Sequence, residues 1–266
     1  MISVVGVPFD EYSSFLRGSA QAPQKIREAF RSDSANYYSE NLINLNGHGG
    51  WQDEGDLKLP AGKDAIAAIE NAMQGYLSKN DKILSIGGDH SVTYPIVKAF
   101  EQKYGKLTIL HMDAHSDLYD DFEGNKYSHA CPFARIMEGG LASRLIQVGI
   151  RTMNAHQSDQ AKRFGVEVIE MKHWRNDMRF KLEGPVYISL DMDAIDPAFA
   201  PGVSHHEPGG FTSREIISLL QNLKGNIVGA DLVEYNPTRD ESGITAMLAA
   251  KLFKELLSLL LMNENA

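Results

Sequence analysis

The sequence of 266 residues is almost without cysteine and has no long hydrophobic run. Cys131 is the only cysteine, so an internal disulfide is impossible and a reducing compartment is expected. The longest apolar run, Leu256–Met262, is far too short to span a bilayer. The start of the chain lacks the basic and apolar segments of a signal peptide. These absences predict a cytoplasmic protein without a membrane partner.

Positive charge is also scarce. There are 26 Lys and Arg against 35 Asp and Glu, which gives a formal net charge of −9. Binding to phosphate backbones needs clustered Lys and Arg, so a nucleic-acid partner is not expected. Hydrophobic residues make up 43% and charged residues 23%, as in ordinary globular proteins. Because no linker or repeat interrupts the chain, we predict a single domain over residues 1–266.

Short apolar runs alternate with longer amphipathic ones along the whole chain. This alternation predicts βαβ units, a mostly parallel central sheet and a three-layer α/β/α fold. The predicted strands are Ile2–Val7, Lys82–Ile86, Leu107–His111, Leu145–Gly149, Val166–Ile169, Val186–Leu190 and Ile227–Val233. The predicted helices are Ala22–Phe30, Lys63–Leu77, Val92–Phe100, Pro132–Glu138, Ala155–Phe164, Ser213–Leu223 and Gly243–Met262. The polar, glycine-rich segment Asn41–Pro60 is predicted to be a loop.

Four polar clusters directly follow predicted strands. They are Gly87–Ser91 (GGDHS), Asp113–Asp117 (DAHSD), Asp191–Pro197 (DMDAIDP) and Glu234 in DLVEYNP. In an open α/β sheet, ligands bind beyond the carboxyl ends of the strands. We therefore expect these clusters, which are distant in sequence, to converge on one crevice.

The residue types in these clusters predict a metal centre. In an extended segment, the carboxylate, imidazole and carboxylate of DAHSD point to the same side. The candidate ligands are His90, Asp113, His115, Asp117, Asp191 and Asp193. Four carboxylates in one crevice need counter-charge, which two divalent cations would supply. Carboxylate and imidazole donors without a thiolate cluster favour Mn²⁺.

GGDHS, DAHSD and SLDMDAIDPAFAPG resemble the signature motifs of the ureohydrolases, the family of arginase and agmatinase. The resemblance covers nearly the whole chain, and the segment ESGITAMLAAKLFKELL is more similar to agmatinases than to arginases. It implies an arginase-like α/β/α fold with a binuclear Mn²⁺ centre. Because relatives are usually trimers or hexamers, it also implies a homo-oligomer.

The resemblance further implies a role for each site residue. His90 and Asp117 would hold one metal, His115 and Asp193 the other, and Asp113 and Asp191 would bridge both. The metals would activate a water that attacks the guanidinium carbon. Asp117 could also pass a proton to the leaving amine. His129 matches the family's mobile proton-carrying histidine, and Glu234 matches the glutamate that bonds to the guanidinium.

Two segments bear on the substrate. The loop Leu118–Ser128 offers Asp120 and Asp121, which would repel a carboxylate and could attract a terminal ammonium. This favours agmatine, which would be cleaved to urea and putrescine. The segment Val203–Gly210 (VSHHEPGG) departs from the family's pattern, and His205 is expected to contact the substrate at the rim. Arginase, guanidinobutyrase and formimidoylglutamase activities stay open as alternatives.

Three other classes of protein share part of this pattern. A metallo-phosphoesterase also combines D-x-H with a glycine-rich histidine element, but in the opposite order along the chain. A mononuclear zinc deacetylase on the same fold needs only an Asp-His-Asp set, whereas this chain also has His90 and Asp117. A non-catalytic paralogue is disfavoured by the complete set of ligand candidates.

Overall fold

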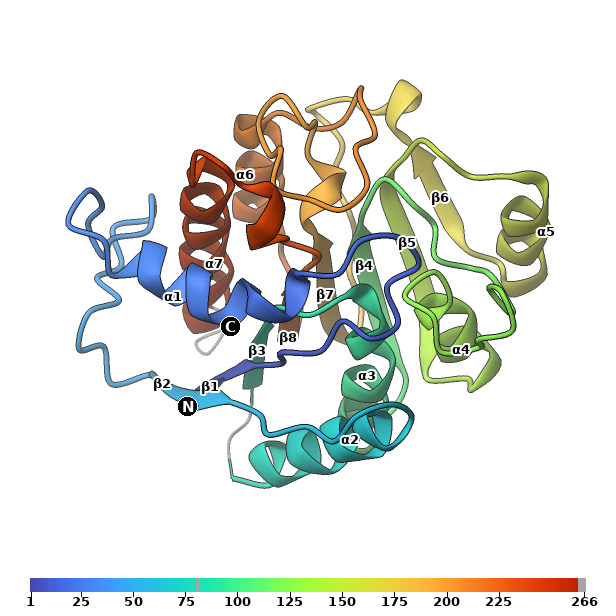
Figure 1. Cartoon of the computed structure of the whole chain (residues 1–266), viewed down its shortest axis with the longest axis horizontal. Coiled ribbons are helices and arrows are strands. Elements are labelled where there is room, and N and C mark those ends of the chain that lie inside the picture. Colours follow the sequence, from blue (N-terminus) through green and yellow to red (C-terminus); the bar gives the residue numbers. More distant parts are fainter. Residues whose placement is uncertain (80–81, 263–266) are drawn as a thin grey trace.

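The computed structural model describes residues 1–79 and 82–262. Within this part of the chain, one eight-stranded sheet has the order β2-β1-β3-β8-β7-β4-β5-β6, and all neighbouring strands pair in parallel (Figure 1). The strands are β1 (Ile2–Gly6), β2 (Trp51–Asp56), β3 (Lys82–Ile86), β4 (Leu107–Met112), β5 (Ala142–Ile150), β6 (Glu167–Glu170), β7 (Pro185–Asp191) and β8 (Asn226–Val233).

Helices cover both faces of the sheet, which confirms the predicted three layers. The helices are α1 (Ala22–Phe30), α2 (Asp64–Leu77), α3 (Thr93–Tyr104), α4 (Pro132–Glu138), α5 (Ala155–Phe164), α6 (Ser213–Asn222) and α7 (Ile244–Met262). Helices α1, α6 and α7 pack together on one face, while α2, α3 and α4 pack on the other (Figure 1). Helix α5 lies beside α4, toward the β6 edge.

Successive residues of the central strands enter two separate hydrophobic cores. Val4 and Leu84 point into the core under α1, α6 and α7. Their neighbours Val5 and Ile83 point into the core under α2 and α3. Because side chains alternate along a strand, a strand that is covered on both faces is apolar at most of its positions. This explains the nearly continuous apolar runs of the sequence.

The edge strand β2 contradicts the prediction that Asn41–Pro60 is entirely loop. Its sequence, WQDEGD, contains no apolar run, and its residues are only partly buried or exposed. Because β2 pairs with β1 alone and borders solvent on its other side, it needs no apolar pattern. The pairing partner of such a strand cannot be read from its own composition.

The apolar C-terminal run is part of the core. Helix α7 packs against α1, α6 and β8, and its residues Leu256, Leu257 and Leu260 are fully buried. Among the described residues, no helix combines the length and the hydropathy that crossing a bilayer requires.

Candidate metal centre

The strand order brings the four polar clusters to one edge of the sheet. Strands β3, β8, β7 and β4 are consecutive neighbours in the centre of the sheet (Figure 1). The clusters that follow them therefore lie side by side at the carboxyl ends of four adjacent strands. The polar clusters converge because of this strand order. The hydrophobic periodicity of the sequence does not by itself specify the order of strands in a sheet.

His90 lies in a 3₁₀ turn after β3, and its Nδ1 atom faces three carboxylates. The Nδ1–Oδ2 distances are 3.1 Å to Asp113, 3.2 Å to Asp117 and 3.1 Å to Asp191. Burial opposes a charge on the ring, yet these carboxylates raise the pKa of His90 well above its usual value. A positive charge at Nδ1, either a proton or a metal ion, is therefore electrostatically favoured.

A buried polar chain fixes which nitrogen of His90 carries the ring proton. Ser189 donates its single hydroxyl hydrogen to Asp231 at 2.7 Å, so its oxygen accepts from Nε2 of His90 at 2.9 Å. The Nδ1 lone pair is then left toward the carboxylates, and this buried atom has no hydrogen-bond partner in the described chain. A lone pair among three anions is the arrangement that a divalent cation satisfies.

His115 forms the second half of the cluster. Its Nδ1 atom lies 3.0 Å from Oδ2 of Asp193 and 3.4 Å from Oδ1 of Asp113. Asp113 thus turns one oxygen toward each of the two imidazoles. The backbone N–H of Ala114 donates to Asp193 at 3.1 Å, and that of Asp193 donates to Asp191 at 2.7 Å. These bonds hold the carboxylates in place, and all six predicted ligand candidates meet.

The electrostatics of the cluster favour bound cations. Burial raises the pKa of Asp191 well above its usual value, and repulsion from Asp193 and Asp113 adds to the shift. Burial also raises the pKa of Asp193, to about 6. These shifts measure how unfavourable the buried anions are without counter-charge. The oxygen and nitrogen donors, with no thiolate among them, fit divalent cations such as Mn²⁺.

A third imidazole, His111, was not predicted from the sequence. Gln147 donates from Nε2 to its Nδ1 at 3.0 Å, so the ring proton is on Nε2 of His111, which donates to Asp113 at 2.7 Å. Neither ring nitrogen keeps a free lone pair for a metal, and His111 instead orients the Asp113 carboxylate. Its position two residues before Asp113 in a strand was a usable signal, since such residues share a face.

His129 and Glu234 form a second pair at the crevice. Nδ1 of His129 lies 2.7 Å from Oε1 of Glu234, which also accepts the backbone N–H of His90 at 2.9 Å. The backbone N–H of Ser14 donates to Nε2 at 3.0 Å, so the ring proton is on Nδ1. Burial opposes a charge on His129, but Glu234 raises its pKa to about 9. A second proton on Nε2 would displace the Ser14 N–H.

Two site residues have a strained backbone. Asp117 has φ 49° and Glu234 has φ 63°, in the left-handed region that non-glycine residues rarely adopt. Gly88 is required nearby for a related reason, because its φ is +88° and a Cβ would lie 2.7 Å from the carbonyl oxygen of Val7. Such conformations persist only where the surrounding structure holds them, and they are typical of functional sites.

A cavity of about 170 Å³ opens over these residues. It is lined by Ser14, His115, Asp117, Tyr119, Phe122, His129, Ala130, Thr152, Gln157, Asp191, Asp193, His205 and Glu234. The predicted rim residue His205 is therefore in the lining. Its ring centroid lies 5.5 Å from that of His115 and 5.4 Å from that of His129.

The predicted substrate contacts Asp120 and Asp121 are not in the lining of this cavity. Asp120 pairs with His156, with an Oδ1–Nε2 distance of 3.0 Å. Asp121 accepts the backbone N–H of Gly124 at 2.7 Å within its own loop. Uncharged side chains from the segments after β4 and β5, including Tyr119, line the cavity instead.

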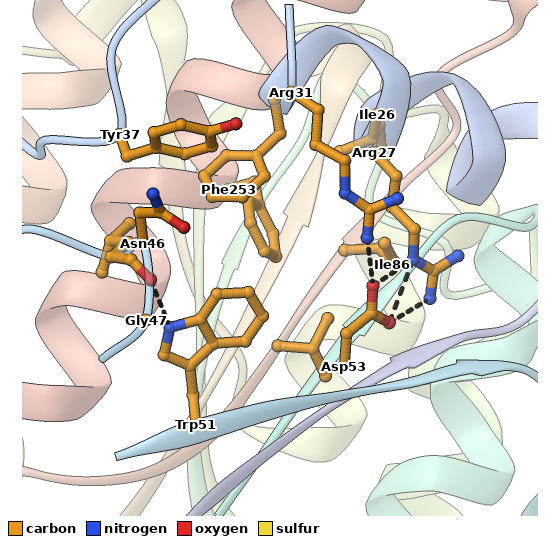
Figure 2. Close-up of a pocket in the computed structure, with 13 residues that line it drawn as sticks. Ile26, Arg27, Arg31, Tyr37, Asn46, Gly47, Trp51, Asp53, Ile86 and Phe253 are labelled. Carbon is orange, nitrogen blue, oxygen red and sulfur yellow. Dashed lines mark hydrogen bonds and ion pairs between the residues drawn. The ribbon is translucent and has the colours of Figure 1, made fainter. Parts of the chain in front are cut away.

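A second cavity, of about 250 Å³, lies away from the strand ends, between α1, α7 and the start of β2 (Figure 2). Tyr37, Trp51 and Phe253 form its walls, and Asp53 lies between two arginines at its side (Figure 2). Its charged groups are paired with each other, and it holds no cluster of histidines and carboxylates. The smaller crevice is therefore the candidate active site.

Comparison with known proteins identifies the family of the chain. The chain matches the arginase family over residues 1–258. It is 48% identical to the mitochondrial arginase of Medicago truncatula, with 96% of this chain and 80% of that protein covered. A solved structure of arginase from Medicago truncatula superposes with a TM-score of 0.93 at 46% identity, with 97% of this chain and 87% of that chain covered.

Identity to the agmatinase of Bacillus subtilis is 34%, with 95% of this chain and 89% of that protein covered. Over the whole chain, identity is therefore higher to the arginase than to this agmatinase, so the resemblance of the C-terminal segment to agmatinases does not extend to the chain as a whole. The fold, the donor set and the relatives together show that the chain belongs to the arginase family of ureohydrolases.

Proposed function

We propose that this enzyme hydrolyses the guanidino group of arginine to urea and ornithine, with two Mn²⁺ ions at the six candidate ligands. The observation that carries the choice of arginine is the 48% identity to an arginase over 96% of the chain, against 34% to an agmatinase. The binuclear centre is supported by the two imidazoles, each of which faces its own carboxylates and shares Asp113 with the other.

The lining of the crevice also supports an amino-acid substrate. Agmatine was expected because Asp120 and Asp121 would repel a substrate carboxylate, but Asp120 is paired with His156 and neither residue lines the crevice. The uncharged residues Tyr119, Thr152 and Gln157 would meet the substrate tail without repelling its carboxylate. The contact of His205 with the substrate belongs to this proposal as well.

The residues of the crevice have separable tasks. Divalent cations bound here would lower the pKa of a shared water and so supply the nucleophile. Glu234 uses Oε1 for His129 and the backbone of His90, while its Oε2 makes no hydrogen bond within the described residues. That free oxygen suits a guanidinium N–H. Asp117 would pass a proton toward the leaving amine, and His129 would exchange protons at Nε2.

Agmatine is the second candidate substrate, favoured by the 34% identity to an agmatinase over 95% of the chain. It carries the same guanidinium group but has no carboxylate at its far end. The two candidates therefore differ only in what the far end of the crevice accepts.

Urea release from a panel of guanidines, with added Mn²⁺, tests the proposal. The panel contains arginine, agmatine, guanidinobutyrate, guanidinopropionate and formiminoglutamate. We expect kcat/KM for arginine to exceed that for agmatine by roughly 100-fold, the discrimination that about 3 kcal/mol of tail contacts provides. A preference for agmatine would select the second candidate. Hydrolysis of an aryl phosphate without urea release from any guanidine would refute both.

The same proposal includes a single catalytic domain over residues 1–266, a trimeric or hexameric assembly and a cytoplasmic location. Light scattering measures the assembly. Cell fractionation measures the location, which matters because the Medicago relative is named as mitochondrial.

A further inference from the structure

The loop of residues 9–18, which follows β1, is hydrogen-bonded to residues of the crevice and of the motif after β3. The backbone N–H of Tyr12 donates to Oδ2 of Asp89 at 3.0 Å, in the motif after β3. The backbone N–H of His129 donates to the carbonyl of Tyr12 at 3.1 Å. The chain start therefore reaches over the carboxyl ends of central strands, where the dark blue segment turns in Figure 1. The loop places Ser14 in the lining of the crevice.

Ser14 is the link between His129 and solvent. The His129 ring is buried, with the residue only 8% exposed, whereas Ser14 is exposed. Oγ of Ser14 lies 2.7 Å from Nε2 of His129, and its backbone nitrogen lies 3.0 Å from the same atom. Within residues 1–79 and 82–262, the atoms that hydrogen-bond to this Nε2 all belong to Ser14.

The hydroxyl can do what the amide cannot. A backbone N–H only donates, so it is compatible with Nε2 only while that nitrogen is unprotonated. A hydroxyl donates or accepts, so it can keep its contact with Nε2 in both protonation states. Nδ1 is occupied by Glu234, which leaves Nε2 as the nitrogen that exchanges protons.

The charged and titratable groups around His129 do not offer a second route at Nε2. The groups that act on its titration or pack against its ring are Glu234 after β8, Asp89 after β3, Asp117 after β4, and His205 in the rim segment. Burial lowers the pKa of His205, and its interaction with His129 lowers it further. Among these groups, Glu234 hydrogen-bonds to the His129 ring, at the opposite nitrogen.

We propose that Ser14 exchanges protons between Nε2 of His129 and solvent through its hydroxyl group. This inference rests on the proposed hydrolase function. In release, Nε2–H gives its proton to Oγ of Ser14 while the serine hydroxyl proton passes to a solvent water. In uptake the two transfers reverse. One proton enters the serine and one leaves it, so the residue is unchanged after each cycle.

The test compares Ser14→Ala with the wild-type enzyme in steady-state urea release across pH and buffer concentration. Ser14→Ala keeps the backbone N–H but removes the exchange route, so we expect kcat to fall about tenfold with KM changed by less than about twofold. Added imidazole should restore kcat of the variant, because a small buffer can replace the hydroxyl. The wild-type enzyme should not respond to imidazole. Ser14→Thr keeps a hydroxyl and should retain most of kcat.

Ser13→Ala is the matched control, because Ser13 neighbours Ser14 and its hydroxyl donates to Asp89 at 3.3 Å instead of to His129. Its kcat should not depend on imidazole, and elemental analysis should find the same metal content in all variants. Equal kcat of Ser14→Ala and wild type at every pH and buffer concentration would overturn the inference. So would the same imidazole rescue in Ser13→Ala. If the wild-type enzyme releases no urea from any guanidine, the proposed function fails instead.

Discussion

The metal-site crevice and the aromatic cavity beside α1 and α7 differ in how their charged groups are arranged. In the crevice, carboxylates of the same sign are buried together, and burial raises the pKa of Asp191 and Asp193. In the aromatic cavity, each charge has a partner of opposite sign, since Arg27 and Arg31 both bond to Asp53. Of these two cavities, the aromatic one therefore has its charges paired, although it is the larger.

The aromatic cavity contributes to the stability of the fold, whereas the crevice is the candidate functional site. Around the aromatic cavity, the ring of Phe253 meets those of Phe30 at 5.2 Å and Trp51 at 6.3 Å, both edge to face. These contacts stabilise the junction of α1, α7 and the sheet edge. The crevice carries backbone strain and a cluster of buried carboxylates, which the rest of the fold must offset. We therefore expect substitutions in the crevice to lower activity with little loss of stability. Substitutions around the aromatic cavity should lower stability with little loss of activity.

The largest expected effect is that of Asp193→Asn. The variant keeps an acceptor for the Ala114 N–H but removes the charge of a proposed metal ligand, so urea release should fall at least about 1,000-fold, or about 4 kcal/mol. Thermal unfolding of the metal-free variant should occur at the wild-type temperature or above, because one buried anion is gone. Elemental analysis and calorimetry measure both. Asp177→Asn makes the same charge change at an 81% exposed side chain and should alter neither. An active Asp193→Asn enzyme would contradict the metal assignment.

The next effect is that of Phe253→Ala in the aromatic cavity. Phe253 is 2% exposed, so its truncation should lower the free energy of unfolding by about 3–5 kcal/mol. Well below the unfolding temperature, kcat and KM should stay at wild-type values. Urea denaturation and steady-state kinetics at the same temperature measure the two quantities. A large loss of kcat in a folded Phe253→Ala enzyme would show that the two cavities are coupled.

The smallest effect concerns Cys131, a buried residue directly before α4 and close in sequence to His129 of the crevice. Burial raises the pKa of this thiol to about 12, and Asp117 adds to the shift. At pH 8 the thiolate fraction is then about 10⁻⁴, against about a quarter for an ordinary thiol. Iodoacetamide should leave the native protein unmodified over an hour, as mass spectrometry can determine, and the rate should rise toward pH 12. The protein unfolded in guanidinium is the control and should react within minutes. Rapid native labelling would mean that solvent reaches below the crevice.

Much of the fold was predictable because local patterns carry it. Helices α1, α4 and α5 begin and end at the predicted residues, since Pro23 and Pro132 begin two of them and the capping box of Asn154 begins the third. The edge strand β2 was missed because its stability comes from pairing with β1, which no local pattern reports. Ser189 and Asp231, which hold His90, were missed because they lie within β7 and β8 and not in the polar clusters that follow the strands.

The sequence by itself determined which residue types gather at the candidate site, because Asp113, His115 and Asp117 directly follow a buried strand. Their directions depend on the tertiary structure, since the chain bends after β4 ends at Met112 and Asp117 has φ 49°. Only the tertiary structure decided which loop residues enter the crevice. Asp120 turns to His156, while Ser14 reaches His129 from 115 positions away. A loop side chain is oriented by contacts that are distant in sequence, so its direction is settled only when the elements around it have packed.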